Sequence, residues 1–183
     1  VRSSFSPNEG TWVVENHPEG GTMEQAIISG VAHDKSEAKV TIVGVPDRTG
    51  IAARIFQAIA DNDINVDMIV QNVSAAATGL TDISFTVPKA EGQKATTVLQ
   101  RVQGEVGFAS IIYDDTIGKL SLVGAGMRSH PGVTATFFAA MADAGVNIEM
   151  ISTSEIRISV IVREADVERA AKAAHTAFQL DAD

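Results

Sequence analysis

The chain has 183 residues, of which 45% are hydrophobic and 20% charged, and it contains no cysteine. This composition is typical of a globular protein and excludes collagen-like, disordered and disulfide-stabilised classes, a thiol nucleophile and cysteine-ligated metal centres. Fourteen basic and 23 acidic residues give a net charge of −9, which disfavours nucleic acids and anionic membranes as partners. No apolar run approaches the roughly 20 residues that cross a bilayer, so we expect a cytoplasmic protein.

The N-terminal part of the sequence divides into a polar segment and a short apolar one. Residues 1–22 are rich in Ser, Asn, Pro and Gly and show no apolar period, so they are interpreted as a linker. Residues 23–33 contain the apolar run Ala26–Ile28 followed by Val31, which favours a strand.

The next segment predicts the element order βαββαβ. Residues 39–45 alternate and are β-branched, which indicates a strand that ends at the turn 46–50. Apolar residues then recur with helical spacing at Ala52, Ile55, Phe56 and Ile59. The remaining predicted elements are strands at 66–73 and 81–87, a helix around 95–102 and a strand at 109–113.

The same pattern returns later in the chain. Val40–Val45 aligns with Leu120–Ala125 at an offset of 80, and Gly50–Ile69 aligns with Gly132–Ile151 at an offset of 82. Glycine, asparagine and phenylalanine stay in register, which chance similarity between two apolar segments does not explain. The sequence therefore contains two copies of one supersecondary unit.

The second copy is one strand short. It predicts strands at 119–125, 147–153 and 156–163, a helix around 134–141 and a helix around 167–178. The spare strand at 23–33 can supply the missing element. We therefore predict an α+β fold of two ferredoxin-like units, each an antiparallel sheet with helices on one face. The first unit takes residues 38–115 and the second takes 23–37 together with 116–183.

The turn between the first strand and helix of each copy is a candidate binding site. Free N–H groups at a helix N-terminus, together with the helix dipole, bind a carboxylate or phosphate. In the first copy, Asp47 can complement the ammonium group of an amino acid whose carboxylate lies on the N–H groups after Gly50. The alternative is that Asp47, Gly50 and Gly132 only shape tight turns and helix caps.

Other polar residues give no catalytic or metal centre. Asn65 and Asn147, at the start of equivalent strands, can bind a polar ligand or cap the preceding loop. The four histidines lack metal-ligand spacing, the acidic pairs fall in loops, and Ser129-His130 lacks an orienting acid.

Several strings resemble a known family. The βαββαβ repeat with Gly44-Val45-Pro46-Asp47-Arg48-Thr49-Gly50 and the strand starts Asn65-Val66-Asp67 and Asn147-Ile148-Glu149 resembles the ACT domain, a small-molecule regulatory module. The strings Lys119-Leu120-Ser121-Leu122-Val123-Gly124-Ala125-Gly126-Met127 and Ser152-Thr153-Ser154-Glu155-Ile156-Arg157-Ile158-Ser159-Val160 resemble the regulatory half of bacterial aspartate kinases. The string Val1-Arg2-Ser3-Ser4-Phe5 resembles the end of the kinase domain in that family, so residues 1–22 are expected to be that end and a linker.

The resemblance implies a regulatory β subunit or region of an ATP-dependent phosphotransferase whose catalytic residues lie upstream. It implies no cofactor and no catalytic residue in this chain, a homodimer through ACT units, and the catalytic α subunit as a partner. It also implies that threonine, alone or with lysine, binds between units and inhibits the first step of aspartate-family amino-acid biosynthesis. A ligand-independent dimerisation module of a larger assembly is the alternative.

Carried over by motif, the threonine contacts come from two facing units. The first unit supplies the strand–helix turn and one residue of the next strand: Asp47, Arg48, Thr49, Gly50, Ile51, Ala52 and Gln71. The facing unit supplies its helix start, a strand start and a hairpin turn: Val133, Thr134, Asn147, Ile148, Ser154 and Glu155.

Overall fold

The computed structural model describes residues 27–73, 77–125, 127 and 130–180. The first unit consists of β2 (Glu37–Pro46), α1 (Ile51–Ala60), β3 (Ile69–Gln71), β4 (Leu80–Pro88), α2 (Lys89–Val106) and β5 (Ser110–Asp114). The second consists of β1 (Ile27–Asp34), β6 (Ile117–Ala125), α3 (Pro131–Asp143), β7 (Met150–Thr153), β8 (Arg157–Arg163), a 3₁₀ turn at Glu164–Asp166 and α4 (Val167–Ala177).

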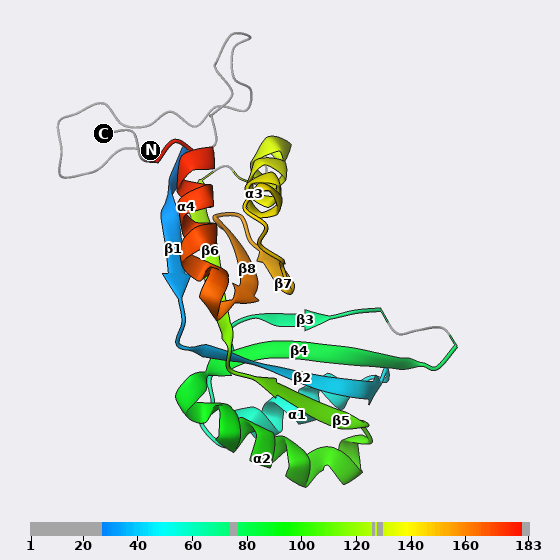
Figure 1. Ribbon diagram of the computed structural model, residues 1–183. Helices are drawn as coiled ribbons and strands as arrows, with labels where there is room; N and C mark the ends of the chain where they lie inside the picture. The colour runs from blue at the N-terminus through cyan, green and yellow to red at the C-terminus, as the bar shows by residue number, and fades with distance from the viewer. Residues whose placement is uncertain (1–26, 74–76, 126, 128–129, 181–183) are drawn as a thin grey trace, which may run out of the picture.

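Each unit is a four-stranded antiparallel sheet with the same strand order. The first sheet runs β3-β4-β2-β5 and the second runs β7-β8-β6-β1, so β1 occupies the position that β5 holds in the first unit (Figure 1). β1 pairs along β6 from Ile27↔Ala125 to Asp34↔Lys119. The expected ferredoxin-like pair, with an N-terminal strand completing the second sheet, is confirmed. Residues 23–26 of the predicted strand lie outside the described residues.

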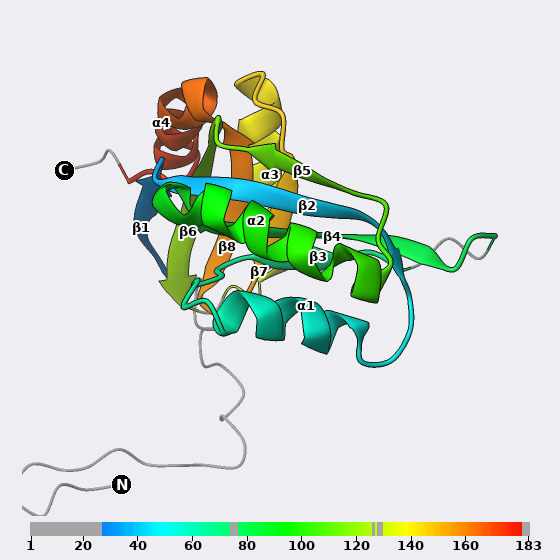
Figure 2. The same cartoon turned by 90° about the horizontal axis from the view of Figure 1, so that it is seen from below.

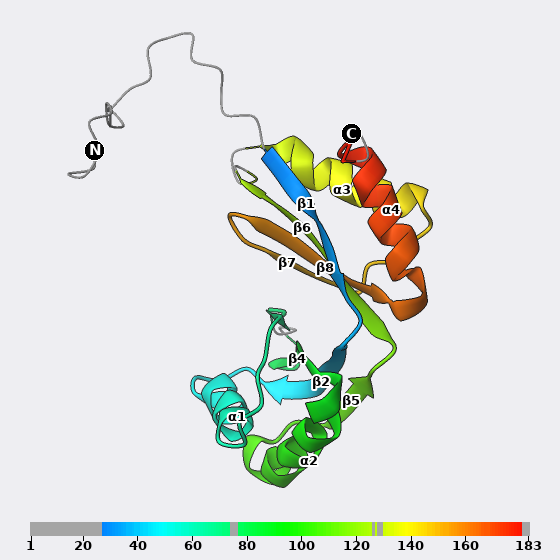
Figure 3. The same ribbon diagram turned by 90° about the vertical axis from the view of Figure 1, so that its left-hand side faces the viewer.

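The helices cover one face of each sheet. Figure 2 shows α1 and α2 side by side across the first sheet, and Figure 3 shows α3 and α4 on the second. In α1 the spacing of apolar residues buries Ile55 and Ile59 against the sheet. Phe85 of the first core and Phe137 of the second are fully buried. Each unit therefore has its own hydrophobic core.

Two predicted strands begin later than expected, and the first of them also ends two residues early. The strand predicted at 66–73 is β3 at Ile69–Gln71, and the strand predicted at 147–153 is β7 at Met150–Thr153. Before β3 the ladder is irregular, because the hydroxyl oxygen of Thr86 accepts the N–H of Met68 at 3.2 Å while the Thr86 carbonyl accepts that of Asp67. A side chain thus replaces one backbone partner, which periodicity does not reveal.

The units meet at a junction where the chain crosses twice, from β1 to β2 and from β5 to β6 (Figure 3). Each crossing is an Asp-x-Ser/Thr turn. The Asp34 carboxylate accepts the N–H of Ser36 at 2.7 Å, and the Asp114 carboxylate accepts that of Thr116 at 2.9 Å. A small third core lies at the junction and is formed by Met68, Ile117, Met150 and Ile161. Across the described segments, every helix is too short or too polar to cross a bilayer.

Candidate functional site

The turn between β2 and α1 leaves the start of that helix open. Gly50 precedes the helix with φ of 91°, a left-handed conformation that favours glycine, and no side chain among the described residues caps the helix. The turn is closed by backbone bonds, in which Arg48 N–H donates to Pro46 and Ile51 N–H donates to Arg48. The first turn of α1 carries no acidic residue. The positive end of the helix dipole therefore faces the exposed turn.

The β3–β4 hairpin holds this turn in place. The N–H of Asp47 donates to the carbonyl of Gly79 at 2.9 Å, and Pro46 pairs with Leu80. The buried hydroxyl of Thr81 donates to the carbonyl of Asn72 at 2.8 Å. Because Asn72 follows Gln71 directly, the structure brings Gln71 to the same end of the first sheet as residues 47–52. Residues 47–52 and Gln71 are exposed except for Ile51, which packs partly against the core.

In the second unit, four of the predicted contacts lie at the sheet end away from the junction. Val133 is buried and Thr134 half-buried in the first turn of α3. Ser154 and Glu155 are exposed in the β7–β8 turn, where the Ser154 N–H donates to the carbonyl of Arg157 at 2.7 Å. The carbonyl of Ile156 accepts the N–H of Gly124 at the end of β6, and this end of the sheet is also where α3 begins.

Asn147 and Ile148 lie at the opposite end of the second sheet, next to the junction. They come just before β7, and β7 runs parallel to β6 because both are antiparallel to β8. Asn147 is exposed and Ile148 is half-buried. The predicted contacts of one chain therefore fall in three places: the free end of the first sheet, the free end of the second, and the junction.

The structure adds a set of ion pairs at the junction that the sequence analysis did not identify. Lys39 on β2 pairs with Glu149 of the second unit, and Lys119 on β6 pairs with Asp67 of the first unit at 2.6 Å. Lys39 and Lys119 are equivalent in the repeat, as are Asp67 and Glu149. The two pairs therefore cross the junction reciprocally. The signal in the sequence was the preservation of both charges at the repeat offsets.

Further charges extend these pairs. Lys119 also pairs with the buried Glu37, and Arg163 bridges Glu149 at 2.5 Å and Asp114 at 2.7 Å. Burial alone would lower the pKa of Lys119, but hydrogen bonds to the carboxylates of Asp67 and Glu37 outweigh it and raise that pKa. Burial would likewise raise the pKa of Asp114, but hydrogen bonds from Thr116 and Arg163 lower it to about 2.

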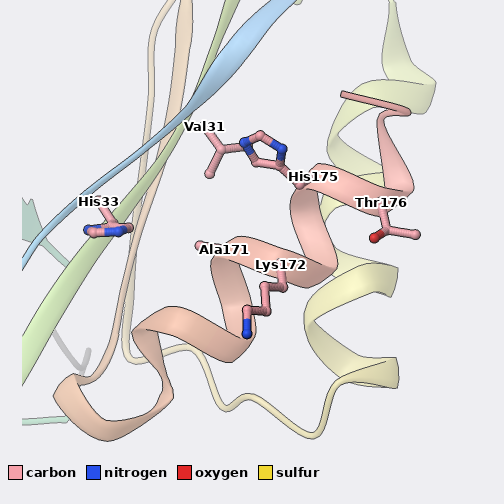
Figure 4. Close-up of a pocket in the computed structure, with 6 residues that line it drawn as sticks. All are labelled: Val31, His33, Ala171, Lys172, His175 and Thr176. Atoms are coloured by element: carbon pink, nitrogen blue, oxygen red, sulfur yellow. The ribbon is translucent and has the colours of Figure 1, made fainter. Parts of the chain in front are cut away.

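Two cavities lie apart from the predicted contacts. One, of about 190 Å³, lies at the junction and is lined by residues that include Asp34, Glu37 and Asp67. The other, of about 550 Å³, lies between β1 and α4 and is lined by Val31, His33, Ala171, Lys172, His175 and Thr176 (Figure 4). None of the thirteen predicted contact residues lines either cavity. In the described ranges, no group of three or more His, Asp or Glu residues is arranged to hold a metal ion.

Comparison with known proteins finds an ACT domain model and aspartokinases that match this chain. An ACT domain model matches residues 40–103 and 120–178. The chain is 54% identical over its whole length to an aspartokinase of Mycolicibacterium smegmatis and 56% identical to one of Mycobacterium tuberculosis, and it covers 43% of each of those proteins. It thus spans less than half the length of these relatives.

Solved structures extend the match to whole chains. The regulatory subunit of aspartate kinase from Thermus flavus is 44% identical with a TM-score of 0.78, and the match covers 84% of this chain and 99% of that one. A chain from a structure of aspartokinase alpha and beta subunits is 46% identical, with the same coverage and TM-score. The chain therefore belongs to the ACT domain family, as a member of the group formed by the regulatory subunits and regulatory regions of aspartate kinase.

Proposed function

We propose that this chain is the feedback sensor of an aspartate kinase and that it binds L-threonine between ACT units of two chains. The observation that carries the proposal is the open N-terminus of α1 after Gly50, with the exposed Asp47 in the same turn. The N–H groups of a helix start bind a carboxylate, and a nearby carboxylate binds an ammonium group. The turn therefore suits the two charged groups of a free amino acid.

The side chain of the ligand is selected by polar contacts. The amide of Gln71 lies at the same end of the sheet as the turn and can bind a hydroxyl group. A site that hydrogen-bonds a ligand hydroxyl discriminates against an analogue without it, because its own polar group is then left unpaired. We therefore expect threonine to bind more tightly than valine, which has nearly the same shape.

A second chain completes the site in this proposal. Asn147 and Ile148 lie at the junction rather than beside the turn of their own chain, so they are available to the turn of a facing copy. The edge strands β3 and β7 carry Ile69 and Ile151, which are exposed and equivalent in the repeat. Exposed apolar side chains on edge strands support pairing with another chain. The proposed assembly is a homodimer that attaches to the catalytic part of the kinase.

Inhibition follows from a population shift. Threonine bound between two units favours the arrangement of chains in which both halves of the site meet. The attached catalytic part responds to that arrangement, and the coupling equals the difference in threonine affinity between the two arrangements. The start of α3, which also has no side-chain cap, offers a second amino-acid site for threonine or lysine.

Calorimetric titration of the chain with threonine tests the proposal. We expect binding by the wild-type chain and a loss of at least about tenfold in the Asp47→Asn variant, because the ammonium group loses its charge partner. Asp115→Asn, which removes an exposed charge from the β5–β6 turn, is the matched control and should bind normally.

Titration with lysine alone and with lysine and threonine together tests whether lysine also binds.

The rival function is a ligand-independent dimerisation module. It predicts that no amino acid changes the midpoint of thermal unfolding, since a ligand that binds only the folded state must raise that midpoint. A wild-type chain that binds neither amino acid would overturn the proposed function.

A further inference from the structure

Glu149 ties a predicted ligand-binding segment to the other unit of the same chain. It follows Asn147 and Ile148 directly, and its N–H donates to the carbonyl of Ile161 at 2.8 Å. Its side chain is only 12% exposed. One carboxylate oxygen accepts a hydrogen bond from Lys39, and the other lies 2.5 Å from Arg163.

Lys39 lies in a well-ordered part of the first sheet, because its strand is hydrogen-bonded on both sides. It lies on β2, a central strand, where it pairs with Thr86 of β4 on one side and Asp114 of β5 on the other. Its side chain is 16% exposed. The same strand continues to Pro46 and the turn at Asp47. A single strand therefore connects the Lys39–Glu149 ion pair to the proposed carboxylate site.

The reciprocal pair, Lys119 and Asp67, is built differently. Lys119 has a second carboxylate partner in Glu37, whose equivalent in the repeat is the apolar Ile117. Glu149, by contrast, is the one ion-pair partner that the described residues give Lys39. Removing Asp67 leaves its lysine paired, whereas removing Glu149 leaves a mostly buried ammonium group without a counter-charge. Within the described part of the chain, the segment before β7 is therefore tied to the other unit through Glu149 as the one acid on Lys39, whereas the lysine that holds the segment before β3 has two acidic partners.

We propose that Lys39 and Glu149 are positioning residues for the threonine site: they hold Asn147 and Ile148 in the register that a facing chain requires. The inference rests on the proposed function. Neither residue touches the ligand in this scheme. Without Glu149 the Lys39 ammonium group is a buried charge that has lost its partner, which is strongly unfavourable. Without Lys39 the Glu149 carboxylate keeps Arg163 of its own unit and no longer ties its segment to β2. In both cases the segment before β7 shifts, and its contacts with the ligand weaken.

The experiment compares Glu149→Gln, Lys39→Met and Lys39→Arg with Asp67→Asn as the matched control. Asp67 lies in the equivalent segment, but Asn65 and Val66 before it are not among the predicted contacts. Urea denaturation first establishes that each variant folds. Two readouts follow: threonine titration, and hydrogen exchange at the N–H groups of Glu149 and Met150 without ligand.

We expect Glu149→Gln and Lys39→Met to weaken threonine binding by about tenfold and to speed exchange at the start of β7. Lys39→Arg, which keeps the charge, should restore both properties. Asp67→Asn should leave threonine affinity and exchange at Glu149 unchanged. If Glu149→Gln does not fold, the Lys39 pair of variants carries the same comparison.

Two results would overturn the positioning role. One is wild-type threonine affinity in both Glu149→Gln and Lys39→Met, and the other is an equal loss in Asp67→Asn, which would indicate general loosening of the junction. A wild-type chain that does not bind threonine refutes the proposed function instead. In that case exchange at Glu149 and Met150 still decides the positioning role, because it needs no ligand: acceleration confined to the Lys39 and Glu149 variants supports the role, and its absence refutes it.

Discussion

The ammonium group of Lys119 lies 2.6 Å from the carboxylate of Asp67 and joins β6 of the second unit to the segment before β3 of the first. The same lysine pairs with Glu37, which is buried and belongs to β2. One side chain thus neutralises two acids from the other unit. Together with the Lys39–Glu149 ion pair, these contacts of Lys119 connect the two units at the junction.

Replacing Lys119 by Met should strongly destabilise the chain. The side chain is 13% exposed, and its removal leaves Glu37 as a buried carboxylate without a counter-charge. Breaking such a pair costs about 3 kcal/mol. The free energy of unfolding from urea titration measures the loss. Lys35→Met is the control, because Lys35 and Glu168 are exposed at 37% and 73% and a surface pair contributes at most about 1 kcal/mol. Similar losses in both variants would contradict the prediction.

Acid should remove the stabilisation that the Asp114 carboxylate gives to the folded chain. Its pKa is about 2 in the folded chain against 3.8 ordinarily, so the folded state binds this proton less readily than the unfolded state. The stabilisation is present above about pH 4 and disappears as the pH falls through 2; a shift of this size corresponds to roughly 2 kcal/mol.

Comparing wild type with Asp114→Asn in urea from pH 6 to pH 2 measures this contribution. The wild-type advantage should shrink over the lower half of that range. An advantage that stays constant down to pH 2 would show that the pKa of Asp114 is not lowered.

The two aligned glycines, Gly50 and Gly132, should respond differently to alanine. Gly50 has φ of 91°, so Gly50→Ala should cost about 1 kcal/mol in backbone strain and also weaken threonine binding. Gly132 lies within α3, is not among the positive-φ glycines, and has open space around its Cβ position. Gly132→Ala should therefore be neutral or stabilising by about 0.5 kcal/mol. Thermal unfolding of both variants tests this difference, and equal destabilisation would refute it.

Packing at Gly118 should tolerate no side chain. A Cβ at this position would collide with Cγ2 of Val167, which is fully buried where α4 begins against β6. We expect Gly118→Ala to lower the free energy of unfolding by about 2 kcal/mol. The double variant Gly118→Ala with Val167→Ala removes the colliding methyl group. It should lose less than the sum of the two single variants, and additivity would count against the collision.

The sequence by itself was sufficient for the element order and the repeat. Ile55 and Ile59 follow helical spacing and Val40 and Ile42 follow strand spacing, and both kinds of spacing are local properties of the chain. The missing last strand of the second unit also pointed to β1, since a sheet edge without its partner leaves backbone groups unpaired. The strand–helix turns were recognisable for the same local reason, and the Gly50 turn has the open helix start that was expected.

Only the tertiary structure decided where the predicted contacts lie relative to one another. Asn147 and Asp47 fall at different places in one chain, and no local pattern encodes that separation. The junction was equally hidden, because Lys39 and Glu149 are 110 residues apart. Ion pairs between distant residues depend on how two finished sheets pack, whereas hydrophobic periodicity depends on neighbours along the chain. The sequence therefore determined two ACT units, and their packing decided which charges join them.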